Sequence, residues 1–209
     1  MKKIMIVALM LLVTTLSLFA EKVVLIQGTY LSTSRIFEDT VGVGYKETDT
    51  FNEVGINITS FTGKTLGFYA SATFLLPLTW KVTTEQTGYP DTESDGDFNS
   101  DNTNLGIDML LGVGYLLPLG NSFSLLIGAG VHYNGYFIIG DYDTAMSNVL
   151  GAGLAANFII NLSEKFNLNI SAMGAWDLYE IHYSPERSSL YEQKSGYTLA
   201  VSAGLGYSY

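Results

Sequence analysis

The 209-residue chain contains no cysteine and only four prolines. Without cysteine an exported chain has no disulfide framework, so its stability must come from backbone pairing and packing. Ten basic residues stand against twenty acidic ones, and nothing supplies the basic stripe that nucleic acids require. Beyond residue 20 no apolar run reaches the length of a spanning helix. Any passage through a membrane must therefore be made by strands.

The first twenty residues have the parts of a secretory signal peptide. Lys2 and Lys3 precede an apolar run from Ile4, and a small residue, Ala20, stands where cleavage is expected. We therefore expect residues 1–20 to be removed and residues 21–209 to form one domain.

The last fourteen residues, 196–209, alternate strictly between apolar and small or polar side chains. The apolar set is Tyr197, Leu199, Val201, Ala203, Leu205, Tyr207 and Tyr209. A period of two predicts a strand with one apolar face, and the aromatics at both ends suit the interfaces of a membrane.

The same period predicts seven further strands. They span residues 22–32, 51–61, 66–80, 105–117, 123–133, 147–160 and 166–179. In this pattern Trp80 points outward, and Pro77, which cannot donate to a ladder, suggests a bulge or a strand end. Val41 to Tyr45 is a rival for the first strand, and we expect it in the first long loop or as a strand extension.

The predicted connections alternate between short and long. Residues 62–65, 118–122 and 161–165 form short turns, whereas 33–50, 81–104, 134–146 and 180–195 form long loops, the third with Asn134-Gly135 as a turn signal. Outer-membrane barrels have short periplasmic turns and longer external loops. The fold class predicted is all-β: a single eight-stranded antiparallel up-and-down transmembrane β-barrel in the outer membrane of a Gram-negative-type envelope.

The C-terminal strand also carries a motif, Ser202, Gly204, Tyr207 and Tyr209. It resembles the signal by which bacterial outer-membrane barrels are recognised for insertion. By pattern, the whole chain after residue 20 resembles the small eight-stranded outer-membrane families of the OmpX-like, OmpW-like and OmpA-barrel kinds. The resemblance implies outer-membrane lipids and the barrel-assembly machinery as partners.

Glycines recur on the predicted inner face. They are Gly112 and Gly114, Gly128 and Gly130, Gly151 and Gly153, and Gly204 and Gly206, and Leu110, Leu126, Val149 and Met173 share that face. One interpretation is a narrow apolar, porin-like conduit for small hydrophobic molecules, as OmpW-like barrels are thought to provide. The preferred one is that the glycines let inward aromatics such as Tyr69 lie against the wall, because eight strands enclose little more than side chains.

Charged residues are expected inside or at the rim of the barrel. Glu53, Asp108 and Asp177 fall on the inner face, and we expect Lys81 to pair with a carboxylate, because buried charges need partners. His132 is also predicted to face inward, as a hydrogen-bonded polar plug.

An acidic stretch offers a weak metal candidate. Asp91, Glu93, Asp95 and Asp97 precede or follow a glycine as in the start of a calcium loop. The twelfth position is Asn102 rather than glutamate, so a solvated acidic loop is the preferred interpretation. No cofactor is expected.

Catalysis has one remote candidate. His182-Tyr183-Ser184 resembles the His-x-Ser of outer-membrane lipid A deacylases, and Glu186 or Glu192 could orient the histidine. Pro185 stands where that family carries an asparagine. We therefore predict a non-enzymatic barrel that is structural, binds surface ligands through its external loops, or both.

Overall fold

The chain folds into nine antiparallel strands in a computed structural model that describes residues 23–39, 44–96, 103–139, 144–183 and 191–208. The strands are β1 (Val23–Asp39), β2 (Tyr45–Gly63), β3 (Leu66–Gln86), β4 (Thr92–Gly96), β5 (Thr103–Pro118), β6 (Phe123–Ile139), β7 (Thr144–Asn161), β8 (Phe166–Tyr183) and β9 (Tyr191–Ser208). No helix within these ranges is long and apolar enough to cross a membrane. Residues 1–20 lie outside them, so the signal peptide and its cleavage at Ala20 stay predictions.

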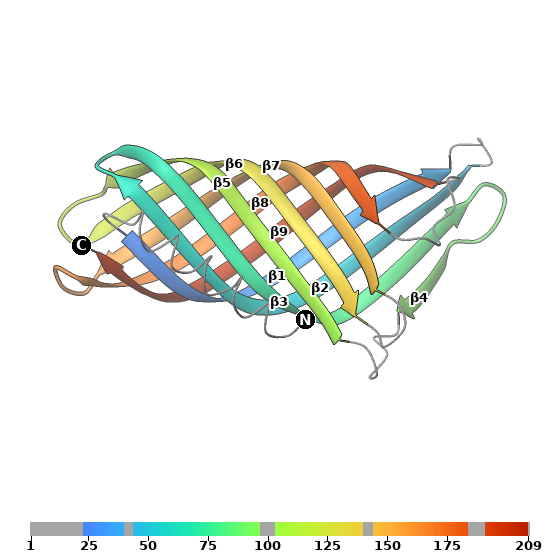
Figure 1. Cartoon of the computed structure of the whole chain (residues 1–209), viewed down its shortest axis with the longest axis horizontal. Coiled ribbons are helices and arrows are strands. Elements are labelled where there is room, and N and C mark those ends of the chain that lie inside the picture. Colours follow the sequence, from blue (N-terminus) through green and yellow to red (C-terminus); the bar gives the residue numbers. More distant parts are fainter. Residues whose placement is uncertain (1–22, 40–43, 97–102, 140–143, 184–190, 209) are drawn as a thin grey trace.

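Eight strands close into a barrel (Figure 1). β1 pairs with β9 along its whole length and with β2 on its other edge, and β2 pairs with β3. The remaining strands follow one another in chain order from β9 back to β5. The predicted eight-stranded antiparallel barrel is therefore confirmed, and the first strand is β1, which contains most of the predicted 22–32 segment. Of the rival run, Tyr45 begins β2 and residues 41–43 lie outside the described ranges.

The strands run further than the sequence predicts at the end remote from the short turns, here called the outer end. β1 continues to Asp39, and β2 begins at Tyr45. The predicted loop 134–146 was wrong, since Asn134 and Gly135 lie inside β6. A tilted strand needs about 9–11 residues to cross a bilayer. Strands of 16 to 21 residues therefore carry the barrel wall beyond the membrane.

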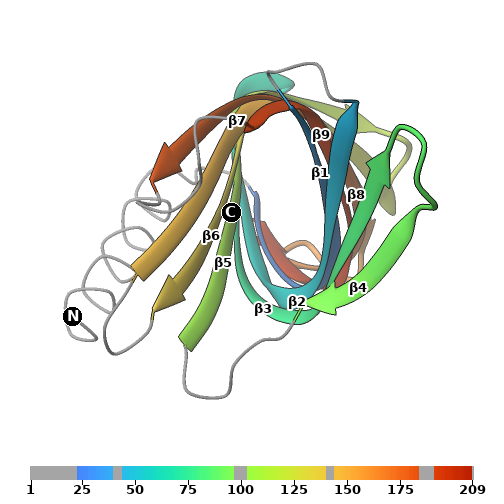
Figure 2. The same cartoon turned by 90° about the vertical axis from the view of Figure 1, so that its right-hand side faces the viewer.

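The predicted loop 81–104 also contains regular structure. β3 extends to Gln86, and β4 folds back on it, pairing Thr92–Gly96 with Trp80–Thr84. β5 pairs with the same edge of β3 only from Leu66 to Leu75. β3 thus exchanges one partner for another toward the outer end, and Figure 2, which looks onto that end, shows β4 and β5 standing apart.

Most outward side chains of the barrel wall are apolar, and they stay exposed because other side chains already fill the interior. Ile56, Val113 and Leu154 keep 59%, 60% and 62% of their surface exposed. We call this band of exposed apolar side chains the apolar belt. Two aromatic pairs lie toward the short turns, Phe123 with Phe158 and Phe166 with Tyr207. A soluble protein rarely exposes such a band, whereas a membrane barrel must.

One sequence prediction about direction was wrong. Trp80 points inward, stacked on Phe51 with ring centroids 5.6 Å apart. The cause is a β-bulge, because the register shifts where Glu53 pairs with Pro77 while Asn52 pairs with Thr79. The extra residue reverses the alternation that follows it. The proline signalled the bulge, but a pattern continued through it predicted Thr79 inward and Trp80 outward, the reverse of their positions in β3.

Candidate functional site

A buried histidine lies between two carboxylates in the barrel interior. His132 on β6 places Nε2 2.6 Å from Oδ2 of Asp108 on β5, and Nδ1 2.8 Å from Oδ1 of Asp177 on β8. All three side chains are almost completely buried. A carboxylate only accepts hydrogen bonds, so this geometry suits the doubly protonated ring, which donates from both nitrogens.

The strand between His132 and Asp177 makes this contact possible. In register His132 lies beside Gly151 of β7, and Gly151 lies beside Asp177 of β8. Gly151 has no side chain to separate them, and a Cβ there would collide with the backbone carbonyl of Trp176. The histidine therefore reaches across a whole strand to its second carboxylate.

Neutral groups and one arginine complete the network. Thr198 donates to Asp177 over 3.2 Å, and Asn134 donates to Asp108 over 3.3 Å. Arg35 of β1 in turn donates to Oδ1 of Asn134 over 2.6 Å. Five strands are thereby joined by charge-assisted hydrogen bonds across the barrel lumen. We call Arg35, Asp108, His132, Asn134, Asp177 and Thr198 the lumen network.

Aromatic rings cover the lumen network toward the outer end. Phe51 packs against Trp80 and, at 5.2 Å, against Tyr136, and the Arg35 guanidinium lies 5.5 Å from the Phe51 ring centre. Glu53 is buried nearby. The network is thus a polar plug with aromatic rings on its outer side, as the sequence predicted for His132.

Between the lumen network and the short turns, the inward glycines and apolar residues pack against one another. Leu110 and Leu126 are fully buried, and Met173 packs against both apolar clusters of the interior. A Cβ on Gly128 would meet the ring of Tyr69, and one on Gly114 would meet Phe61 and Tyr69.

The remaining glycines of the set lie close to neighbouring strands. Side chains added to Gly112, Gly130 or Gly204 would strike adjacent backbone, whereas at Gly153 they would press on Leu110. One cavity in the polar middle layer, between residues that include Asn57 and Asn157, has a volume of about 20 Å³.

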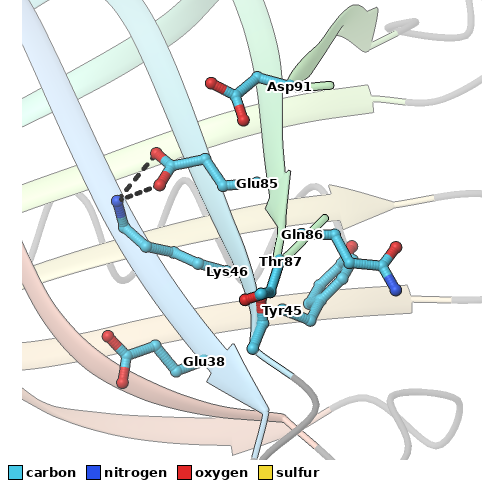
Figure 3. Close-up of a pocket in the computed structure, with 8 residues that line it drawn as sticks. Glu38, Tyr45, Lys46, Glu85, Gln86, Thr87 and Asp91 are labelled. Carbon is cyan, nitrogen blue, oxygen red and sulfur yellow. Dashed lines mark hydrogen bonds and ion pairs between the residues drawn. The ribbon is translucent and has the colours of Figure 1, made fainter. Parts of the chain in front are cut away.

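A polar pocket of about 610 Å³ lies at the outer end. Figure 3 shows Lys46 of β2 reaching the carboxylate of Glu85 of β3, with Nζ–O distances of 2.9 and 3.0 Å. Glu38 and Asp91 add two further carboxylates to the lining. We call this the rim pocket. Its net charge is negative, and it stands on the parts of β1, β2 and β3 that continue past the apolar belt.

The calcium candidate falls on the hairpin beside the rim pocket. Asp91 precedes β4, Glu93 and Asp95 lie within it, and Asp97 is outside the described residues. Lys81 Nζ lies 2.6 Å from Glu93, which raises the pKa of Lys81 and lowers the pKa of Glu93, chiefly through the hydrogen bond. Within the described ranges no three acidic or histidine side chains are grouped as a metal site. The expected partner of Lys81 is thus on an exposed hairpin rather than in the lumen.

The two other sequence motifs lie at opposite ends. Ser202, Gly204 and Tyr207 belong to β9, where Tyr207 packs edge-on against Phe166 at 5.4 Å, and Tyr209 is outside the described residues. His182 and Tyr183 end β8, whereas Ser184, Pro185 and Glu186 are outside the described residues. The hydrolase hypothesis therefore gains no support from the described side chains.

The sequence prediction missed Arg35, the one arginine of the lumen network. The signal was present, because Thr33, Arg35 and Phe37 continue the inward alternation of β1 beyond residue 32. The polar composition of this segment predicts a loop, whereas its period of two predicts a strand.

Comparison with known proteins supports the fold and nothing finer. No family model matches the sequence, and no curated protein matches it. The outer membrane protein OprG from Pseudomonas aeruginosa aligns with 91% of this chain and 97% of its own, with a TM-score of 0.52 and 16% identity. Neisserial surface protein A aligns with 88% and 97%, at a TM-score of 0.49 and 10% identity. Ail of Yersinia pestis aligns with 89% of this chain and 99% of its own, with a TM-score of 0.38 and 11% identity. With its closed barrel and apolar belt, the chain is a small eight-stranded outer-membrane β-barrel.

Proposed function

We propose that this barrel is a non-enzymatic surface protein whose rim pocket binds cationic groups outside the cell. The observation that carries the proposal is the contrast between its two ends. The lumen is packed and covered by aromatic rings, whereas the rim pocket is open, acidic and raised on extended strands. A cationic ligand would meet Glu38 and Asp91 beside the Lys46–Glu85 ion pair.

Electrostatic complementarity predicts both the kind of ligand and its salt dependence. In this membrane setting, outer-membrane lipids hold the apolar belt and the assembly machinery inserts the barrel through its C-terminal motif. Both partners are part of the proposal.

The test uses the protein in lipid nanodiscs and an oligolysine peptide as the probe. Surface plasmon resonance should show binding that weakens as salt increases, and a polyanion such as heparin should not bind. A double variant that carries both Glu38→Gln and Asp91→Asn should bind oligolysine much more weakly than the parent protein. Glu164→Gln, which removes an exposed carboxylate at the opposite end, is the matched control. Binding that is absent, or equal in all three proteins, would contradict the proposal.

A second candidate is a conduit for small hydrophobic molecules. One observation favours it: among the described residues β3 pairs with β5 only up to Leu75, so this part of the wall is not continuously bonded there. Flux of a small apolar solute into liposomes should then exceed that into empty liposomes. The packed glycines and leucines of the lumen favour the rim pocket as the functional feature.

A further inference from the structure

A groove of about 730 Å³ crosses the outward face of β6, β7, β8 and β9. Small residues on three neighbouring strands, Ala129, Ala152 and Gly174, line it, together with the larger Leu154 and Leu199. The register alternates these sizes, since Ala129 pairs with Leu154, Leu154 with Gly174, and Gly174 with Leu199. The small positions are therefore recesses between large neighbours.

Packing does not require the recess at Gly174. A Cβ added there would meet only Leu199 Cδ2, at 3.6 Å, an ordinary van der Waals contact. The inward glycines are different, because a side chain on Gly128 or Gly151 would collide with a ring or with backbone. A Cβ therefore fits at position 174, and a wall that faces lipid accepts an apolar side chain there.

The groove is continuous with the apolar belt. Leu154, Leu199 and Trp176 keep 62%, 55% and 63% of their surface exposed. At one end of the groove stand Trp176 and Tyr197, adjacent in register and followed by Ser195 and Gly196. Amphipathic rings of this kind mark the level of lipid headgroups. A molecule in the groove would thus have its polar part beside the rings and its apolar part among the small residues.

We propose that the groove seats one acyl chain of a bilayer lipid as an ordered, specifically bound lipid. The groove crosses three strand intervals, or about 14 Å at the usual spacing of 4.7–4.9 Å, which suits a chain rather than a compact solute. Small residues allow close approach, and dispersion contacts along the recess provide the affinity where no hydrophobic driving force acts.

The test is photo-crosslinking in nanodiscs made with a phosphatidylethanolamine that carries a diazirine on one acyl chain. Mass spectrometry should locate most adducts on the groove, and few around Ala203, which lies on the same belt outside it. Ala152→Leu and, separately, Gly174→Leu should reduce the groove adducts to the level of the belt. Ala156→Leu, an outward alanine on the strand of Ala152 but outside the groove, should leave them unchanged.

Each protein is first shown to be folded by its faster gel migration without boiling, and either filled variant suffices if the other fails to fold. Adducts spread evenly around the belt would overturn the proposal. So would groove labelling that survives both substitutions. Barrel dimers detected by native mass spectrometry, if lost on filling the groove, would assign it to a second copy of the chain instead.

Discussion

Removing the histidine from the lumen network should strongly destabilise the barrel. His132→Leu leaves Asp108 and Asp177 buried without the ring that bridges them at 2.6 and 2.8 Å. Removing one partner of a buried ionic group typically costs about 3–5 kcal/mol, because a buried charge is left uncompensated. We expect a loss in that range in the free energy of unfolding, measured by guanidinium titration in lipid vesicles through tryptophan fluorescence.

A triple variant separates charge from packing. Asp108→Asn and Asp177→Asn added to His132→Leu remove both charges, while the amide oxygens still accept from Asn134 and Thr198. Most of the lost stability should return, since neutral replacements of buried ionic groups are often tolerated. Val131→Leu, on the lipid-facing side of the same strand, is the control and should change little. The reasoning would be refuted if the free energy of unfolding of His132→Leu were within about 1 kcal/mol of the parent's, because that is well under the cost expected for an uncompensated buried charge. A triple variant no more stable than His132→Leu would refute it as well.

Three further predictions concern other parts of the barrel. Gly128→Leu overfills the lumen and should cost about 1–3 kcal/mol in the same titration, because the ring packed on that glycine must move. Lipids brominated on their acyl chains should quench Trp176 but not Trp80; equal quenching would contradict the bulge that turns Trp80 inward. The ion pair lowers the pKa of Glu93, so its contribution is present above the ordinary glutamate pKa and is lost as pH falls through the lowered value. Lys81→Gln should bring the Glu93 pKa, followed by NMR, back toward its ordinary value, and an unchanged titration would count against the pair.

The transmembrane part of the fold could be predicted because one physical rule governs it. A closed barrel in lipid needs strict alternation, and Val113, Leu154 and Val201 are apolar and outward as that rule requires. Beyond the belt, both faces of the wall meet water or polar groups, so hydropathy no longer reports the strand. That is why the sequence predicts the end of the first strand at residue 32 and a turn at Asn134-Gly135.

The candidate sites were less accessible to sequence reasoning. The inward position of His132 followed from parity, but its partners depend on register across four strands, β5 to β8, and on Gly151 between His132 and Asp177. The rim pocket joins Glu38, Lys46 and Glu85 from three strands whose outer ends the sequence predicts to be loops. The groove depends on relative side-chain size among outward residues that a binary apolar pattern treats as equal.

The change of partner along β3 divides the barrel mechanically. Up to Leu75 the wall is a cylinder in which every strand has two hydrogen-bonded neighbours, and a cylinder resists shear. Beyond Leu75 the ladders describe a curled sheet with two edges, one ending on β4 and the other on β5. Among the described residues no backbone ladder joins the β4 edge of this sheet to its β5 edge. Up to Leu75 the diameter of the barrel is therefore set by the backbone ladders, whereas beyond Leu75 it depends on the side chains between β4 and β5.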